Sequence, residues 1–272
     1  MAERKKLTIH DLQEAKRKGL QLTETFTANP LEAAACEEAG IDMVVTVKRK
    51  AEEIRKAAPN VFLVIADDIH SPKINSEAES IRSGFEALEL GGDALYTHVS
   101  TKWVSAMARE HISVIGHVGY VPYRQSWYGK ARAVGKTSTE AMWVYEETLA
   151  YQDAGAIGVE MEIVPAKMAD EIAKRVQIII MSMGSGRGGD AQYLFATDIL
   201  GTNKGHLPRH AKVYADLLEA EKKVHDLRVK ALSEFRREVS EGIYPEEKHL
   251  IGVKDEELNT FISALEKRPH LP

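Results

Sequence analysis

The stretch that decides the fold is DMVVTVKRKAEEIRKAAPNVFLVIAD, residues 42–67. Short β-branched runs begin and end it, and a charged, helix-forming segment lies between them. A strand, a helix and a second strand in this order predict a βαβ unit with parallel strands. With its two runs included, the chain has eight such runs, at residues 22–26, 42–47, 61–67, 93–98, 112–117, 157–162, 176–183 and 193–196. The sequence therefore predicts an α/β protein built as a single (β/α)8 TIM barrel.

The segments between the runs carry residues that start and stop helices. The first of them has Asn29 as a cap, Pro30 in the first turn and Gly40 as a stop. We expect helices over residues 29–40, 75–92, 137–155 and 209–242. The last is long and amphipathic, so we expect it to cover the barrel or a neighbouring subunit. The expected organisation is one barrel domain over residues 1–272, with residues 209–272 as a C-terminal helical extension.

Composition narrows the classes of protein that the chain can belong to. Its 272 residues are 44% apolar and 28% charged, which is enough apolar material for a full globular core. The formal charge of −5 argues against nucleic acid or an anionic membrane as the main partner. The single cysteine, Cys36, excludes an intrachain disulfide and a multi-cysteine metal site. The first residues are too charged for a signal peptide, and no apolar run is long enough for a membrane span, so we expect a soluble cytoplasmic protein.

Ionisable residues collect at one end of the predicted strands. Active sites of such barrels form at the C-terminal ends of the strands. The positions inside the runs are mostly apolar, whereas the ends carry Lys48, Asp67, His98, His117 and Glu162. This distribution predicts an enzyme with its active site at that end.

Three of these residues also have a purely structural interpretation. Lys48 opens a charged run that could be a solvated helix face. Asp67 could cap a turn, and His98 could be a structural histidine. The sequence leaves both interpretations open for each of them.

His117 and Glu162 point more strongly to a functional site. His117 lies in the segment GHVG, whose glycines permit close approach of the backbone. Glu162 ends an apolar run, and a carboxylate buried there needs a partner. Glu160 precedes it by two positions and could point inward below it, in which case we expect a cation or a second charge nearby.

A glycine-rich segment, MGSGRGGD at residues 183–190, follows the seventh run. Loops at this place bind phosphate or carboxylate groups in many barrels, because their backbone N–H groups face the ligand. A flexible lid has the same composition. The segment therefore leaves two interpretations open, an anion-binding loop and a lid.

The segment GHVGYVPYRQSWYGKARAVGKT, residues 116–137, resembles the signature of the ketopantoate hydroxymethyltransferase family, which opens on G-H-x-G and closes on G-K-T. Residues 154–176, AGAIGVEMEIVPAKMADEIAKRV, resemble the family's A-G-A and L-E-x-V-P segment. Residues 25–42 and the tail over 210–249 resemble further motifs. The resemblance covers roughly residues 6–250, and the chain is identified as a divergent member of this family, within the phosphoenolpyruvate mutase/isocitrate lyase-like barrel superfamily.

The resemblance implies an activity and a set of roles. Family members are (β/α)8 barrels that bind Mg²⁺ and transfer a hydroxymethyl group from methylenetetrahydrofolate to 2-oxoisovalerate, which gives ketopantoate. The metal polarises the 2-oxo acid, a glutamate assists enolisation, and the chains assemble as a decamer. By resemblance, Asp67 is a metal ligand, Glu162 is the acid/base and His117 is the catalytic-site histidine of G-H-x-G.

The sequence departs from the family around this site. A family loop with a metal-binding aspartate and a substrate-binding serine is missing after Val47, where the chain runs into Lys48. A substrate-binding lysine of the family is Tyr96 here, and a metal-site glutamate is His98. The family's G-I-G-A-G becomes S-M-G-S-G. The residues that we expect to bind substrate are Tyr96, Ser182, Ser185 and Arg187.

These changes alter the expected metal. Mg²⁺ prefers an all-oxygen shell, whereas Asp67 and His98, with His117 or His70, would suit Zn²⁺, Mn²⁺ or Fe²⁺ better. We expect an enzyme that makes or breaks a carbon–carbon bond next to the carbonyl of a 2-oxo acid or a related small carboxylate. A divalent metal would stabilise the enolate, and Glu162 would move the proton. Methylenetetrahydrofolate is expected only if the family reaction is retained.

Two alternatives stay open. Lys48 brings a positive charge where a metal ligand is lost, so it could balance a substrate carboxylate or form a Schiff base in a metal-independent lyase. The chain could also be a catalytically silent homologue that acts as an assembly partner. Against the silent homologue, Lys48, His98, Arg187 and Asp190 are all predicted at the catalytic end. We expect a homo-oligomer, a decamer by resemblance.

Overall fold

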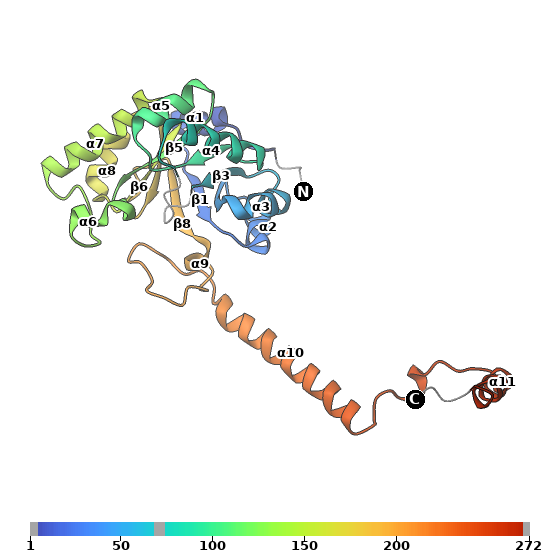
Figure 1. Ribbon diagram of the computed structural model, residues 1–272. Helices are drawn as coiled ribbons and strands as arrows, with labels where there is room; N and C mark the ends of the chain where they lie inside the picture. The colour runs from blue at the N-terminus through green and yellow to red at the C-terminus, as the bar shows by residue number, and fades with distance from the viewer. Residues whose placement is uncertain (1–4, 68–73, 269–272) are drawn as a thin grey trace. The chain divides into compact units, whose positions relative to one another are not determined.

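The computed structural model describes residues 5–67 and 74–268. The chain falls into two compact units, residues 1–216 and residues 217–272. The first unit is a closed barrel of eight parallel strands in sequence order, with helices around it (Figure 1). The predicted barrel fold is therefore confirmed.

Every predicted run overlaps one strand of the barrel. The strands are β1 Leu22–Phe26, β2 Met43–Val47, β3 Phe62–Ala66, β4 Ala94–Tyr96, β5 Val114–Gly119, β6 Gly158–Glu162, β7 Ile179–Met183 and β8 Ala191–Phe195. The strand β8 begins earlier than its run predicts, because Ala191 already pairs with Leu22 where β8 closes the barrel against β1.

Helices connect most of the strands. They are α1 Ile9–Lys18, α2 Pro30–Ala39, α3 Ala51–Ala57, α4 Glu77–Glu89, α5 Thr101–Arg109, α6 Gln125–Tyr128, α7 Ser138–Asp153, α8 Ala166–Ala173 and α9 Ala196–Ile199. Short 3₁₀ turns, η1 Lys48–Lys50 and η2 Pro122–Arg124, precede α3 and α6. The predicted signals act as expected at α2, where the Asn29 side chain accepts from the Leu31 N–H and Gly40 ends the helix at φ +80°.

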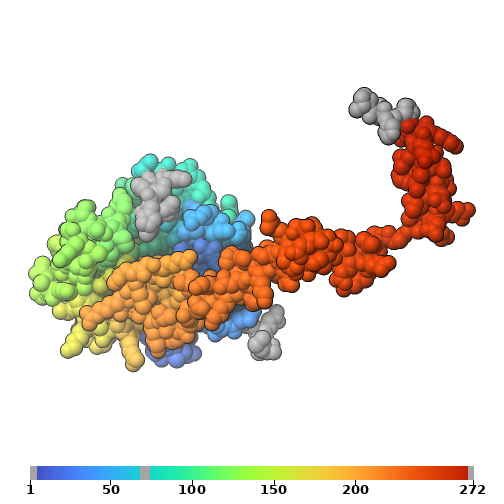
Figure 2. All heavy atoms as spheres, turned by 90° about the horizontal axis from the view of Figure 1, so that it is seen from below, coloured from blue at the N-terminus to red at the C-terminus, as the bar shows by residue number. Residues whose placement is uncertain are grey.

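The long helix predicted over residues 209–242 is shorter than expected. It is α10, Leu217–Ser240. The backbone before it makes other hydrogen bonds, from the Tyr214 N–H to the Ile199 carbonyl and from the Ala211 N–H to the Pro208 carbonyl. Figure 2 shows this segment, in light orange, on the surface of the first unit.

The second unit is helical. It consists of α10, η3 Glu247–His249 and α11 Asp255–Glu266. The described helix α10 has no buried residue, and it exposes Leu227, Leu232 and Phe235. Within residues 5–67 and 74–268, no helix is both long and apolar enough to cross a membrane.

The barrel separates two apolar cores. Residues such as Val44, Leu63 and Leu95 pack in the core between the strands and the helices. Phe62 and Ile115 pack in the core inside the barrel. The inner core is not wholly apolar, because several buried titratable side chains share it: Glu24, Tyr96, His117, Glu160 and Tyr193.

Two glycines let β5 pass close to its neighbours, as its sequence predicts. A Cβ on Gly116 would overlap the ring of Tyr151, which packs against the strand there. Gly119 has φ +85°, and a Cβ on it would lie 2.5 Å from the Glu162 carbonyl oxygen. Because both positions exclude a side chain, His117 is held between them at a fixed place beside β6.

Candidate active site

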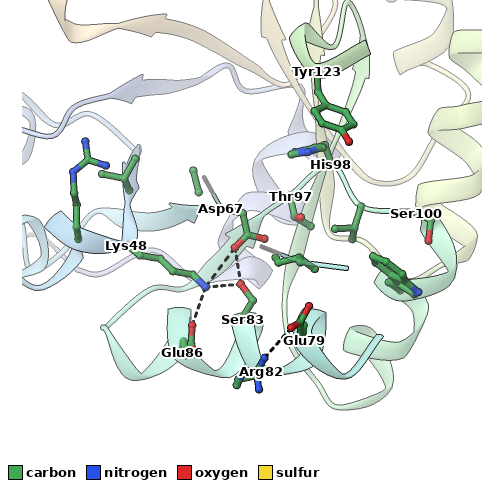
Figure 3. Close-up of a pocket in the computed structure, with 16 residues that line it drawn as sticks. Lys48, Asp67, Glu79, Arg82, Ser83, Glu86, Thr97, His98, Ser100 and Tyr123 are labelled. Carbon is green, nitrogen blue, oxygen red and sulfur yellow. Dashed lines mark hydrogen bonds and ion pairs between the residues drawn. The ribbon is translucent and has the colours of Figure 1, made fainter. Parts of the chain in front are cut away.

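A cavity of about 910 Å³ opens at the C-terminal ends of β2, β3 and β4. Lys48 and Asp67 directly follow β2 and β3, His98 lies two residues after β4, and all three line the cavity. Residues of α4 form the facing wall (Figure 3). The strand ends therefore bring three of the predicted site residues into one cavity.

Lys48 and Asp67 point toward each other (Figure 3). The Lys48 Nζ lies 3.4 Å from Asp67 Oδ1 and 3.1 Å from Glu86 Oε2. Ser83 is between them on α4: its hydroxyl donates to Asp67 Oδ1 at 2.5 Å and contacts the Lys48 ammonium. The Asp67 side chain is 8% exposed and the Lys48 side chain 28%, so solvent screens this ion pair only in part.

Two polar atoms of the cavity wall lack hydrogen-bond partners. Within residues 5–67 and 74–268, neither Asp67 Oδ2 nor His98 Nδ1 has one, although both atoms are buried. The His98 ring packs against the Tyr123 ring at 5.0 Å between centroids. Desolvation, and then the charge of His117, lower the pKa of His98 although Asp67 acts in the opposite direction. His98 is therefore favoured in its neutral form, which has a lone pair for a metal or a donor.

Asp67 Oδ2 and His98 Nδ1 are the atoms of the cavity wall that could coordinate a metal ion. Among the described side chains, no three His, Cys, Asp or Glu are placed to hold a metal together. His70, a possible third ligand, lies outside the described residues. The orphaned carboxylate oxygen and imidazole nitrogen fit a site of two protein ligands, in which water and substrate would complete the coordination.

A second group of residues lies inside the mouth of the barrel. His117 Nε2 is 3.0 Å from Glu162 Oε2, a contact that is not aligned as a hydrogen bond among the described atoms. Catalytic pairs often align only when substrate is bound. The other ring nitrogen, His117 Nδ1, lies 2.5 Å from the hydroxyl of Tyr96. Glu162 thus lies at the barrel mouth next to the buried His117, whose other ring nitrogen contacts Tyr96.

Below this pair, two glutamates are buried in the barrel. Glu24 and Glu160 are each 2% exposed. Burial raises the pKa of Glu24 to about 8. Burial, and then the charges of Glu24 and Glu162, raise the pKa of Glu160 well above its ordinary value. The second charge expected near Glu160 is therefore another carboxyl, Glu24, and not a cation.

The two groups adjoin through His98, whose pKa responds to both Asp67 and His117. His117 and Glu162 are not among the described residues that line the 910 Å³ cavity. The cavity and the acid–base pair are therefore neighbouring parts of the catalytic end.

The predicted substrate-binding residues are not among the described residues that line the cavity. Tyr96 points into the barrel and contacts His117. The Ser182 hydroxyl donates to the Gly186 carbonyl, and the Ser185 hydroxyl donates to the Met161 carbonyl. Arg187 is exposed on the loop that leads from β7 back to β8. Substrate contact by Tyr96, Ser182, Ser185 and Arg187 stays a prediction.

Asp190 lies at the opposite end from the one expected. Its backbone carbonyl accepts from the N–H of Leu22, the first residue of β1. Its side chain accepts from Lys16 of α1 and from the backbone of Ile180. The segment between β7 and β8 contains no helix. It leads the chain back to the N-terminal end of the barrel, and Asp190 is its last residue before β8.

Known proteins resemble the chain in sequence and in fold. The model of the ketopantoate hydroxymethyltransferase family matches residues 46–247. A 3-methyl-2-oxobutanoate hydroxymethyltransferase of Methylibium petroleiphilum is 28% identical over 99% of this chain and 97% of that protein. The enzyme of the same name from Pyrobaculum islandicum is 33% identical over 74% of this chain and 75% of that protein.

The solved structures agree on the fold. A 2,3-dimethylmalate lyase of the phosphoenolpyruvate mutase/isocitrate lyase superfamily superposes with a TM-score of 0.53 and 15% identity, over 95% of this chain and 99% of that chain. A phosphonopyruvate hydrolase in complex with oxalate and Mg²⁺ superposes with a TM-score of 0.51 and 13% identity, over 96% of this chain and 99% of that chain. The family match confirms the resemblance read from the sequence, and the chain is an enzyme that transfers or cleaves carbon–carbon bonds. It belongs to the ketopantoate hydroxymethyltransferase family.

Proposed function

We propose that this enzyme makes or breaks a carbon–carbon bond next to the carbonyl of a 2-oxo acid, by way of an enolate. The observation that carries the proposal is the placement of Glu162 against His117 at the barrel mouth, next to a cavity with a lysine ammonium. A carboxylate held this way can remove a proton from the carbon beside the carbonyl. The relatives' name, 3-methyl-2-oxobutanoate hydroxymethyltransferase, supports the 2-oxo acid as substrate class.

Each residue has a distinct role in this mechanism. The Lys48 ammonium, which lines the cavity beside Asp67, binds the carboxylate of the substrate. Glu162 takes the proton from C3 and becomes a carboxylic acid, and the electron pair of the broken C–H bond forms the enolate. The enolate carbon then attacks the carbon of a one-carbon carbonyl electrophile at the oxidation level of formaldehyde, the electron pair of the broken C=O π bond goes to its oxygen, and Glu162 returns its proton to that oxygen to give the new hydroxyl. With methylenetetrahydrofolate as the donor, one water molecule supplies this oxygen and tetrahydrofolate leaves.

A divalent metal would bind at Asp67 Oδ2 and His98 Nδ1. When bound, it would supply Lewis-acid stabilisation of the developing enolate oxygen. The presence of an imidazole favours Zn²⁺, Mn²⁺ or Fe²⁺ over Mg²⁺ at this place. Methylenetetrahydrofolate belongs to the proposal only if the electrophile is the one used by the family.

Proton exchange tests the proposed enolate directly. The enzyme is incubated in D₂O with 3-methyl-2-oxobutanoate and with other 2-oxo acids, and loss of the C3–H signal is followed by NMR. We expect enzyme-dependent exchange with at least one 2-oxo acid, without any one-carbon donor. No exchange with any member of the series would contradict the proposal and would favour the silent homologue.

A metal-independent lyase that uses Lys48 is the second candidate, because Lys48 lines the cavity. Its Nζ forms ion pairs with Asp67 and Glu86, whereas a Schiff base needs an amine that is free to attack the carbonyl carbon. We therefore expect no Lys48 adduct when the enzyme and a 2-oxo acid are treated with borohydride and digested for mass spectrometry. An adduct at Lys48 would overturn the electrostatic role and establish the covalent one.

We also propose that the enzyme is a cytoplasmic homo-oligomer, with a decamer as the assembly that the family resemblance implies. Three apolar side chains of α10, Leu227, Leu232 and Phe235, are 66%, 69% and 53% exposed within the second unit. A second copy of the chain would remove this apolar surface from water. Light scattering should give a multiple of 30.2 kDa, and Leu232→Glu should lower it. A wild-type monomer at micromolar concentration would contradict this.

A further inference from the structure

Thr97 lines the cavity of about 910 Å³ at the strand ends (Figure 3). The residue is 1% exposed, and in the part of the chain that the structure describes its hydroxyl oxygen, Oγ1, has no hydrogen-bond partner. Its backbone N–H, by contrast, donates to the Ile115 carbonyl as the strand ladder requires. A buried hydroxyl without a partner lowers the stability of the fold, and most such groups in proteins are paired. On the wall of a cavity, an unpaired hydroxyl points to a ligand.

Thr97 is the neighbour of Asp67 on this wall. Ala66 of β3 pairs in register with Tyr96 of β4, and Asp67 and Thr97 are the residues that follow. The Asp67 N–H donates to the Tyr96 carbonyl at 3.0 Å, so the register continues past the strand ends. Adjacent strands are about 4.8 Å apart, and paired residues share a face. The Asp67 carboxylate and the Thr97 hydroxyl therefore lie next to each other at the cavity.

The two carboxylate oxygens of Asp67 have different surroundings. Oδ1 accepts from the Ser83 hydroxyl at 2.5 Å and lies 3.4 Å from the Lys48 Nζ. Oδ2 is buried, and among the described residues it has no hydrogen-bond partner. Thr97 Oγ1 does not fill this place, because it has no partner either. The cavity wall thus presents an unpaired acceptor beside an unpaired hydroxyl.

A ligand hydroxyl is the group that pairs with both atoms. A carboxylate oxygen only accepts hydrogen bonds, whereas a threonine hydroxyl both donates and accepts. A ligand hydroxyl can accept from the Thr97 O–H and donate its own hydrogen to Asp67 Oδ2. Oδ2 has more than one lone pair, so it can accept this hydrogen bond whether or not a metal binds there as well.

Other polar groups fit this place less well. A ligand carbonyl or carboxylate oxygen would accept from Thr97, but it would leave Asp67 Oδ2 unpaired. A ligand ammonium could donate to both atoms, but the Lys48 ammonium already lies 3.4 Å from Asp67 Oδ1 and would repel it. The donor and acceptor pattern therefore favours an uncharged hydroxyl.

We propose that Thr97 and Asp67 together bind a hydroxyl group of the ligand, so that the cavity prefers hydroxylated 2-oxo acids to the same acids without the hydroxyl. This inference rests on the proposed function, in which the reaction places a new hydroxyl on the product. Lys48 follows β2 on one side of Asp67, and Thr97 follows β4 on the other. The carboxylate of such a product would bind at Lys48 and its hydroxyl at the Asp67–Thr97 side. Thr97 is then a specificity-determining residue.

Matched pairs of ligands test this preference. The acids 2-oxobutanoate and 3,3-dimethyl-2-oxobutanoate are each compared with their 4-hydroxy derivatives, by calorimetry on the full chain with Mn²⁺ present throughout. The members of a pair differ by one hydroxyl, so the ratio of their Kd values measures what that hydroxyl contributes. We expect wild type to bind the hydroxylated member of at least one pair about tenfold more tightly or better, because the new hydrogen bond has a charged acceptor.

Three substitutions assign this ratio to Thr97. Thr97→Val keeps the shape of the side chain but removes the hydroxyl, so it should lower the ratio by about threefold or more. Thr97→Ser keeps the hydroxyl and should keep the ratio. Thr46→Val is the matched control. Thr46 is also a buried threonine whose Oγ1 lacks a partner among the described residues, but it is not one of those that line the cavity, so the ratio should not change.

Thermal unfolding separates ligand binding from a structural role. Neither threonine hydroxyl has a partner within residues 5–67 and 74–268, so Thr97→Val and Thr46→Val should unfold at the wild-type temperature or above it. A lower Tm of Thr97→Val alone would show that its hydroxyl bonds within the protein, and the proposal would be wrong.

The binding ratios can also contradict the proposal. A ratio near one for both pairs in wild type is the result expected if only an ordered water lies between the two atoms, and it would overturn the inference. The same ratio in Thr97→Val and Thr46→Val would overturn it too. Proton exchange at C3 remains the separate test of the proposed function. If exchange is absent but Thr97→Val alone loses the preference, the proposed function fails and the hydroxyl site stands, whereas exchange without a preference has the opposite meaning.

Discussion

Replacement of Glu162 by glutamine is expected to lower the rate of C3 proton exchange by about 10²–10⁴-fold, with little change in substrate affinity. Glutamine has nearly the same shape and keeps a contact with His117, but it cannot accept a proton. The contact at 3.0 Å between Glu162 Oε2 and His117 Nε2 makes this carboxylate the best-placed base at the barrel mouth. NMR exchange rates and substrate titrations measured on the same protein separate the two effects.

Two further variants make this result specific. Glu162→Asp keeps the carboxylate but withdraws it, so it should retain more exchange than Glu162→Gln. Glu171→Gln, on the exposed side of α8, should exchange as wild type does. Thermal unfolding of all three proteins should be similar, because Glu162 is at the rim and not in the apolar core. Wild-type exchange in Glu162→Gln would remove this residue from the mechanism.

The barrel could be predicted from the sequence because each strand is a local pattern. A run such as FLVIA in β3 is β-branched and apolar, and it lies between two helical segments whatever else the chain does. The start of α10 could not be predicted in this way. The Tyr214 N–H donates to the Ile199 carbonyl, and this tertiary hydrogen bond keeps the residues before 217 out of the helix. The hydrophobic periodicity of the sequence gives no sign of such a bond.

Site residues could be predicted where they lie at the end of a single strand. They could not be predicted where a contact depends on how separate elements pack together. Lys48, Asp67 and His98 could be placed at the catalytic end because each follows a strand. Ser83 could not, because it reaches Asp67 from the middle of α4, sixteen residues along the chain. Asp190 was wrongly placed because the length of the return from β7 to β8 is not visible in its composition.

Glu24 is the buried acidic residue whose position inside the barrel is hardest to predict from the sequence. In LTETF it is one polar residue among others, and the alternation of the strand says only that Leu22, Glu24 and Phe26 share a face. That this face is the inside of the barrel follows only when β1 closes against β8. The signal that was available is the pair of inward positions Glu160 and Glu162, which already required a further charged partner.

The second large effect is expected at Asp67. Asp67→Asn should weaken Mn²⁺ binding, measured by calorimetry or by the EPR signal of the free ion, by at least tenfold. Loss of groups that only orient metal ligands costs about 10–100-fold, so loss of a ligand should cost no less. Ser83→Ala is the intermediate case, because Ser83 donates to Asp67 Oδ1 and leaves Oδ2 in place. Asp153→Asn, at the exposed end of α7, is the matched control.

A Lys48 variant is needed to interpret the effect of Asp67→Asn on Mn²⁺ binding. The Lys48 ammonium lies 3.4 Å from Asp67 Oδ1, so it neutralises part of the charge that would attract a divalent ion. Lys48→Met should therefore raise the affinity for Mn²⁺ while it weakens binding of the 2-oxo acid, because the same cation opposes one and attracts the other. If Mn²⁺ binding is the same in wild type, Asp67→Asn and Lys48→Met, then Asp67 is not a metal ligand. The carboxylate would then serve to hold the Lys48 ammonium in place, and the metal-independent mechanism would be the one to pursue.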